Sequence, residues 1–249
     1  MSPTILEIVL LVAAFLVGGV VKGVSGIGMP LLIIPILIQF VSVQSAIAIM
    51  SVPVLITNLM PLSDFEATKK AAIRFKKLLL LVPVGIAVGS LALLYFDARK
   101  LDLLIGLVLG FFSLAGLFNV RFGPDGLDET FWNPIAGFIT GLLGGFSSFY
   151  GPTVALYFSL IKVPREEFIT SGSIIFALAA SSLYVIMAAA GLFTLRDFVI
   201  SVLGLVPIFI GVYFGNKIRK KISEPAFNRL ILWFLLAIAL NQIRRGVGL

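Results

Sequence analysis

The sequence predicts an all-α polytopic membrane protein built from two repeats, and three observations support this. Of 249 residues, 59% are hydrophobic and only 12% are charged, whereas a soluble domain is charged at about a quarter of its positions. Apolar runs long enough to cross a hydrocarbon core of about 30 Å as helices recur along the chain. A glycine-rich interruption of such a run occurs twice, about 120 residues apart.

The chain begins MSPTILEIVL, and the first apolar run starts within these residues. No basic residue precedes the run, whereas a signal peptide needs a positive n-region, so we expect residues 5–21 to be a helix of the mature protein. The run is then interrupted by GVVKGVSGIGMP at residues 19–30. Apolar sequence resumes at 31–40, and a long helix at about 44–62 and spans at 78–96 and 101–118 complete the first half.

The interruption recurs as GFITGLLGGFSSFYGPTVALYF at residues 137–158. Aligned without gaps on residues 19–40, it places Gly19, Gly23 and Gly26 on Gly137, Gly141 and Gly144. Three further apolar runs follow, as in the first half, at 170–190, 198–215 and 226–243. We therefore predict a first membrane repeat, an inter-repeat loop and a second membrane repeat, at residues 1–120, 121–133 and 134–249.

Lysine and arginine counts distinguish two topologies. If each glycine-broken segment crosses the membrane once, there are eight spans, and nine basic residues fall on each side. If each segment enters and returns on one side as a hairpin, 13 fall on one side and five on the other, with Lys22 left inside. The second count obeys the positive-inside rule, so we favour hairpins. The richer side then holds loops 63–77, 119–133, 162–169 and 216–225 with Arg229, and the other side holds Arg99, Lys100, Arg196, Arg244 and Arg245. Three full spans per half is an odd number, so the halves would be inverted repeats, as in many secondary transporters.

The breaks themselves predict an anion site. Backbone that leaves helical geometry inside a bilayer frees N–H and C=O groups that cannot face lipid unpaired. Glycine permits unusual backbone angles, and proline starts a new helix well. Helices restarting near Pro30 and Pro152 would point amino termini, each carrying about half a positive charge, at a common cavity. We predict helix breaks at Pro30, Pro35 and Pro152.

The predicted substrate-binding residues lie in the breaks or close to them: Lys22, Ser25, Gly26, Gly28, Asn58, Gly145, Ser147, Ser148, Tyr150, Gly151 and Thr153. Lys22 either adds positive charge to the site or snorkels from the end of a complete first span. Asn58 either faces the same cavity or makes a hydrogen bond between helices. For the glycines spaced four residues apart, at 19, 23, 137 and 141, we favour close helix packing.

The composition excludes several kinds of chemistry. The chain has no cysteine and no histidine, so it lacks thiolate chemistry, disulfides and the commonest metal ligand. Asp64, Asp97, Asp102 and Asp197 all look interfacial, so no buried carboxylate is available for a proton relay. No GxxxxGK[ST] loop occurs, so any driving energy comes from a gradient or a partner. We expect no cofactor, no metal site and no enzymatic activity, and we attribute the net charge of +7 to cytoplasmic loops rather than to nucleic-acid binding.

With these motifs in view, the chain resembles the sulfite exporter TauE/SafE family of membrane permeases. The resembling segments are GVSGIGMPLLIIPIL at 23–37, GLLGGFSSFYGPTVALYFSL at 141–160, VPREEFITSGSIIF at 163–176 and the stretch 205–240. Two departures stand out. The chain reads Gly28-Met29-Pro30 where many members have three glycines, and Tyr150-Gly151-Pro152-Thr153 where many have Gly-Gly-Pro-Pro.

The resemblance implies transport of a small sulfur-containing anion such as sulfite or an organosulfonate. The residues alone predict a secondary permease of the cell membrane, multi-pass, whose partners are a small anion and the lipid bilayer. Two alternatives stay open: a permease for another small anion such as a carboxylate, and a non-transporting membrane subunit. Assembly into a homo-oligomer is also left open.

Overall fold

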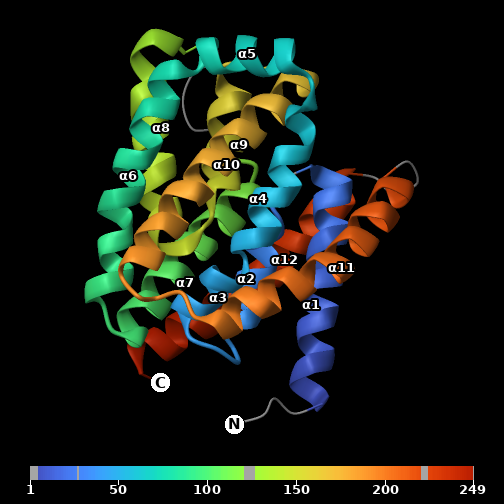
Figure 1. Ribbon diagram of the computed structural model, residues 1–249, viewed down its shortest axis with the longest axis vertical. Helices are drawn as coiled ribbons and strands as arrows, with labels where there is room; N and C mark the ends of the chain where they lie inside the picture. Colours follow the sequence, from blue (N-terminus) through green and yellow to red (C-terminus); the bar gives the residue numbers. More distant parts are fainter. Residues whose placement is uncertain (1–4, 27, 121–126, 220–223, 249) are drawn as a thin grey trace. The chain divides into compact units, whose positions relative to one another are not determined.

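The computed structural model describes residues 5–26, 28–120, 127–219 and 224–248. Of the described residues 87% are helical, and none of them forms a strand. Figure 1 shows the helices in chain order. They are α1 Ile5–Ser25, α2 Met29–Leu37, α3 Val43–Ile49, α4 Ser51–Leu59, the short 3-10 helix η1 Met60–Ser63, α5 Phe65–Arg74, α6 Lys76–Tyr95, α7 Ala98–Leu117, α8 Glu129–Ser147, α9 Tyr150–Leu160, α10 Arg165–Ala189, α11 Leu195–Ile218 and α12 Glu224–Val247.

Six helical segments are long and apolar enough to cross a membrane, which confirms the prediction of a polytopic membrane protein. Each corresponds to one of the three full spans predicted per half. They are Val43–Ser63, Lys76–Tyr95, Ala98–Leu117, Glu166–Ala189, Leu195–Ile218 and Arg229–Val247. The first glycine-broken segment supplies the shorter apolar helix Val9–Ser25.

The helices pack into two compact units, and each unit takes helices from both halves of the sequence. Unit 1 comprises Met1–Met50, Phe96–Val120 and Leu195–Leu249, and unit 2 comprises Ser51–Tyr95 and Arg121–Thr194. The units are defined by packing and the predicted repeats by sequence similarity, so the division into repeats stays a prediction. Part of the predicted inter-repeat loop, residues 121–126, lies outside the described residues, as do 220–223 of the basic loop and residue 27 of the first break.

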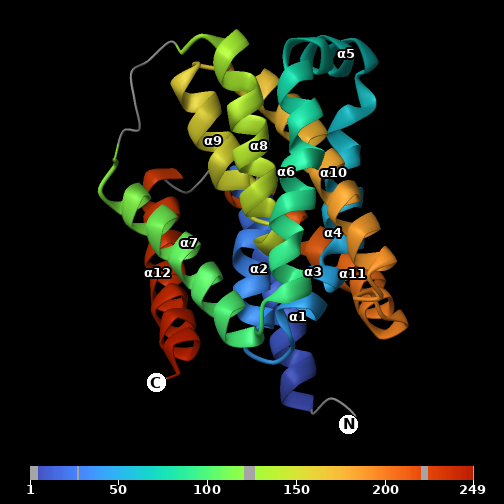
Figure 2. The same ribbon diagram turned by 90° about the vertical axis from the view of Figure 1, so that its left-hand side faces the viewer.

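In unit 1, α1 packs along α11 through facing glycines. A Cβ atom added to Gly19 would overlap the backbone carbonyl of Ile208, and one added to Gly23 would meet that of Val212. Helix α7 lies beside α12 in the same unit (Figure 2), where Gly106 closely faces the α12 backbone. Any side chain at these positions would hold the two helix backbones further apart, so glycine is required where the backbones meet.

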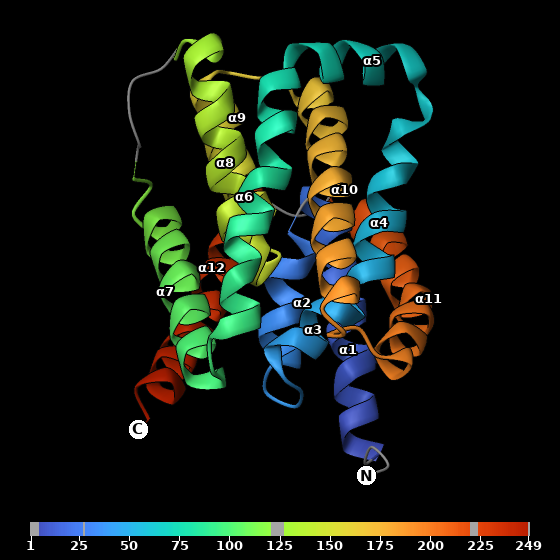
Figure 3. The ribbon, with the colours of Figure 1, turned by 60° about the vertical axis from the view of Figure 1, so that its left-hand side comes forward.

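Unit 2 repeats this packing between α6 and α8, which lie side by side in Figure 3. A Cβ added to Gly137 would overlap the carbonyl of Leu78, and one added to Gly141 would overlap that of Val82. The close-packing role predicted for the four spaced glycines is therefore confirmed. Helix α10 contacts α4, α5, α6 and α9 within the unit.

The glycine contacts of α1 with α11 and of α8 with α6 occur at constant offsets in residue number. Gly19 and Gly23 correspond to Gly137 and Gly141 at an offset of 118 residues, from the sequence alone. Their partners Ile208 and Val212 stand 130 residues after Leu78 and Val82, the partners of the second pair. The contacts of α1 with α11 and of α8 with α6 therefore have the same spacing at these two positions.

Both glycine-broken segments contain a true helix interruption. Gly26 and Gly28 take positive φ values of 80° and 91° between α1 and α2, a conformation that glycine adopts without strain. The second interruption falls at Ser148, with φ of 60°, rather than at a glycine. Pro30 and Pro152 lie in the first turns of α2 and α9, as expected. The break predicted at Pro35 is absent: Pro35 lies inside α2, because proline removes a single N–H and the helix ends two residues later.

Candidate functional site

Four of the predicted site residues lie in unit 1, at the end of α1 and in the break after it. Lys22 is partly buried in the last turn of α1, where the helix dipole favours a cation. The Ser25 hydroxyl donates to the Val21 carbonyl at 2.8 Å, and the Gly26 amide donates to the Lys22 carbonyl at 2.7 Å. Gly28 completes the turn into α2. The α1 terminus is thus closed locally by Ser25 and Gly26.

The other seven lie in unit 2, six of them around the break between α8 and α9. Asn58 of α4 is buried and donates to the Val54 carbonyl at 2.7 Å. Ser147 donates to the Leu143 carbonyl at 2.6 Å and accepts from the Phe149 amide at 3.2 Å. Thr153 likewise donates to the Tyr150 carbonyl at 2.9 Å. The hydroxyls of Ser147 and Thr153 are therefore both hydrogen-bonded to backbone groups near the break.

The glycines near this break have packing roles. A Cβ added to Gly145 would meet the α6 backbone at Ile86 and Ser90 under 3.0 Å, so this residue faces α6. A Cβ on Gly144 would overlap the ring of Tyr150. Gly151 lies in the first turn of α9. The chain turns beyond Gly144 and Gly145, at Ser148.

Ser148 and Tyr150 differ from their neighbours. Both are buried, at 1% and 2% exposure, and neither hydroxyl has a hydrogen-bond partner among the described residues. The same is true of Tyr184, on α10, which is 7% exposed. Sequence reasoning missed Tyr184 because a tyrosine in the apolar run SSLYVIMAAA looks like an ordinary span residue.

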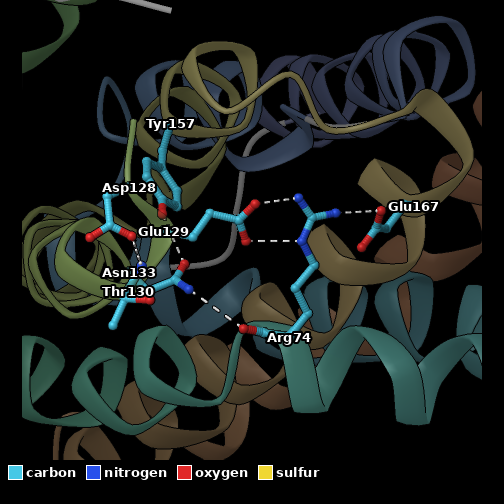
Figure 4. Close-up of polar contacts among 7 residues, drawn as sticks. All are labelled: Arg74, Asp128, Glu129, Thr130, Asn133, Tyr157 and Glu167. Carbon is cyan, nitrogen blue, oxygen red and sulfur yellow. Dashed lines mark hydrogen bonds and ion pairs between the residues drawn. The ribbon is translucent and has the colours of Figure 1, made fainter. Parts of the chain in front are cut away.

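A second polar cluster, also missed from sequence, joins the end of α5 to the starts of α8 and α10 (Figure 4). Arg74, at the end of α5, donates to Glu129 through Nε at 3.0 Å and Nη2 at 2.5 Å, and to Glu167 through Nη1 at 2.6 Å. The hydrogen bond with Glu129, and then that with Glu167, hold the pKa of Arg74 above its ordinary value despite partial burial. We call Arg74, Glu129 and Glu167 the arginine cluster.

Two further side chains extend the arginine cluster toward α9. The Tyr157 hydroxyl donates to the Asn133 side-chain oxygen at 2.9 Å, and Asn133 donates to the Arg74 carbonyl at 3.5 Å. Figure 4 shows these residues next to the Arg74–Glu129 contact. Side chains of α5, α8, α9 and α10 are thus joined at one end of the unit.

The arginine cluster fixes the path of the second broken segment. Glu129 opens α8 and Glu167 lies in the first turn of α10, just after α9. Both bind the same Arg74, so the α8–α9 segment enters and returns at the same end of unit 2. Eight single crossings would have put Glu167 on the opposite side of the membrane from Arg74.

Unit 1 holds an equivalent observation at the start of α7. Arg245, near the end of α12, pairs with Asp102 through Nε at 3.2 Å. Asp102 and Asp197 are buried, at 5% and 4% exposure, so the expectation that no carboxylate is buried was wrong. Arg245 also donates to the carbonyl of Ile38, at the end of α2, at 2.9 Å. The ends of α2 and α12 and the start of α7 therefore lie together, whereas eight single crossings would separate Arg245 from Asp102.

Of the predicted site residues, Lys22, Ser25, Gly26 and Gly28 belong to unit 1 and the remaining seven to unit 2. The four lie around the first break and six of the seven around the second, whereas Asn58 lies apart on α4. In the part of the chain that the structure describes, no group of acidic side chains is arranged to hold a metal ion.

Six spans and an interrupted helical hairpin define a polytopic α-helical membrane protein. The family model described as "Sulfite exporter TauE/SafE" matches residues 10–241. The chain belongs to this family of membrane permeases. No curated protein and no solved structure matches the chain.

Proposed function

We propose that the protein is a secondary carrier for a small sulfur-containing anion, such as sulfite or an organosulfonate, in the cell membrane. The observation that carries the proposal is the α8–α9 break. There, α9 begins without a side-chain cap, and the buried hydroxyls of Ser148 and Tyr150 lie beside it without partners among the described residues. Free amides and hydroxyls at a helix start are donors, and donors suit an anion.

The first break contributes in a similar way. Helix α2 begins after Gly28 without a side-chain cap, and Lys22 stands one turn before the break in α1. In this proposal Lys22 supplies positive charge at the first break, and Ser25, Gly26 and Gly28 shape the turn there. Snorkelling is the competing role for Lys22, and the experiment below separates the two.

Inverted repeats give the carrier its transport mechanism. A hairpin and three spans in residues 1–120 are followed, across the loop 121–133, by a hairpin and three spans in 134–249. The constant offsets between the glycine contacts of α1 with α11 and of α8 with α6 support a duplication. The Arg74 and Arg245 ion pairs support hairpins over single crossings. The two repeats would then alternate access to the anion by rocking.

Sulfite flux into proteoliposomes tests the proposal, with wild type compared with Lys22→Ala and Lys22→Arg after equal insertion has been verified. We expect flux in wild type, loss in Lys22→Ala and partial retention in Lys22→Arg. Equal flux in all three would keep the carrier and assign Lys22 to snorkelling. Absence of sulfite flux in wild type would overturn sulfite as substrate. Carboxylate flux in the same vesicles would then favour the alternative anion, and no flux of any anion a non-transporting subunit.

A further inference from the structure

We propose that Ser148, Tyr150 and Tyr184 form a charge-neutral site in unit 2 that donates hydrogen bonds to the three oxygens of a sulfite or sulfonate group. The inference rests on the proposed carrier function and names the group that the carrier would recognise. It also adds Tyr184, on the long helix α10, to the residues predicted from the broken segment. We call these three residues the hydroxyl triad.

The first step is the cost of leaving these hydroxyls unpaired. Buried polar atoms in native proteins are nearly always hydrogen-bonded, and each one left unpaired is unfavourable. The Ser147 and Thr153 hydroxyls beside the triad obey this rule by bonding backbone carbonyls. Among the described residues, the three triad hydroxyls have no such bond. A ligand that supplies acceptors would remove this cost.

Second, the three side chains come from three separate parts of the fold. Ser148 follows the last turn of α8, Tyr150 opens α9 and Tyr184 lies on α10. Ser148 interacts with the phenol groups of both tyrosines, and Tyr184 also interacts electrostatically with Tyr150. The two phenols approach Ser148 closely enough to interact with it, but these contacts fall short of hydrogen-bond geometry, and none of the three hydroxyls has a partner among the described residues. They are therefore close to one another and still have their donor capacity free.

The third step is the fixed position of Tyr150. Its ring lies over Gly144, where any Cβ would overlap it, and stacks against Phe176 at 6.3 Å between ring centroids. The ring therefore cannot swing to find another partner for its hydroxyl. Ser148 is equally constrained, because its left-handed φ of 60° is set by the turn between α8 and α9. A preorganised donor loses little conformational freedom on binding.

The chemistry of the triad selects an oxyanion with three oxygens. Sulfite and sulfonates each present three oxygen acceptors on one sulfur, one for each hydroxyl, whereas a carboxylate presents two. A hydroxyl binds such an oxygen without bringing a fixed charge into the membrane. Charge is expensive inside a membrane, and a carrier must release its substrate as well as bind it.

The test measures binding of sulfite, methanesulfonate and acetate to the purified full-length protein in detergent by titration calorimetry. The variants are Tyr150→Phe, Tyr184→Phe and Ser148→Gly, each of which removes one hydroxyl. The matched control is Ser171→Ala, which removes another buried hydroxyl without a partner among the described residues, on α10. Ser171 lies 13 residues from Tyr184, about 20 Å along the helix. Thermal unfolding without ligand accompanies each titration.

We expect each triad variant to weaken sulfite and methanesulfonate binding at least tenfold, and the control to leave it unchanged. Thermal midpoints of the ligand-free triad variants should equal or exceed that of wild type, because an unpaired hydroxyl has been removed. Acetate should bind wild type more weakly than methanesulfonate and respond less to the variants.

Several results would overturn the triad. Triad variants that bind like wild type while wild type carries sulfite would reject the triad and leave the carrier intact. Lower thermal midpoints in both Tyr→Phe variants, with affinity unchanged, would show that the hydroxyls hold structural water. Acetate binding equal to that of methanesulfonate would refute the three-oxygen selection. If wild type neither binds nor transports any of these anions, the triad and the proposed function fail together.

Discussion

Replacing Arg74 with methionine should destabilise unit 2 by a modest and calculable amount. Methionine keeps much of the side-chain volume and removes three hydrogen bonds, two to Glu129 and one to Glu167. The side chains in both ion pairs are about a third exposed, at 31–33%, so solvent screens them. At about 0.5–1 kcal/mol for each pair, the expected loss is about 1–2 kcal/mol. For a chain of this size that lowers the thermal midpoint by about 2–8 °C.

The assay is thermal unfolding in detergent, followed by tryptophan fluorescence. Trp132 lies in the first turn of α8, three residues from Glu129, and reports this region, while Trp233 on α12 contributes the rest of the signal. A double-mutant cycle with Glu129→Gln and Glu167→Gln apportions the loss, and the coupling should be larger for Glu129 because two hydrogen bonds join it to Arg74. The control is Lys69→Met on the same helix, whose side chain makes no part of the arginine cluster. An unchanged midpoint in Arg74→Met, or zero coupling in both cycles, would refute the assignment of the cluster as the joint between α5, α8 and α10.

Three further perturbations test the fold. Gly106→Ala should lower the free energy of unfolding by about 1–3 kcal/mol, because the added Cβ would lie 2.9 Å from the Ile243 amide. The control Gly110→Ala, one turn along, should be neutral or stabilising, because its Cβ meets only the Ala239 Cβ at 3.8 Å. Equal unfolding midpoints for the two variants would contradict this packing. Arg245→Ala should lower the free energy of unfolding by about 1–3 kcal/mol, because it leaves the buried Asp102 unpaired. Adding Asp102→Asn should recover part of this loss in the same unfolding assay. No recovery would mean that Arg245 acts only through the Ile38 carbonyl. Because the chain has no cysteine, single cysteines introduced at Lys69, Glu166 and Ala190 can be labelled with a membrane-impermeant maleimide. The cysteines at Lys69 and Glu166 should be labelled from the same side of the membrane, and the cysteine at Ala190 from the other side. Labelling of Lys69 and Glu166 from different sides would disprove the hairpin.

Hydropathy was sufficient to predict the spans, since each is a long apolar run with charges only near its ends. The spacing of Gly19 with Gly23 and of Gly137 with Gly141 predicted packing faces, because glycine at every fourth position has few other uses in a membrane helix. The lysine and arginine count favoured hairpins because basic residues collect on one side of a membrane. Run length, residue spacing and charge counts can all be read from the sequence without knowing which segments are in contact.

The remaining features depend on which distant segments meet. Arg74 lies 55 residues from Glu129 and 93 from Glu167, and no local pattern identifies either carboxylate as its partner. The second interruption was predicted around glycines, but Gly144 and Gly145 are needed for contact with Tyr150 and α6, and the turn falls on Ser148. Tyr184 gains its interest only from the absence of a hydrogen-bond partner among the described residues, which is a property of the folded chain.

The glycine contact between α1 and α11 also constrains the order in which the protein can mature during synthesis. Gly137 meets Leu78 of α6, which has already been made when α8 leaves the ribosome. Gly19 instead meets Ile208, a residue translated roughly 190 positions later. At about 5–20 residues per second, α1 waits about 10–40 s for its partner. During that interval its glycine face has only lipid or a chaperone to contact, so the first helix to be made is among the last to be secured.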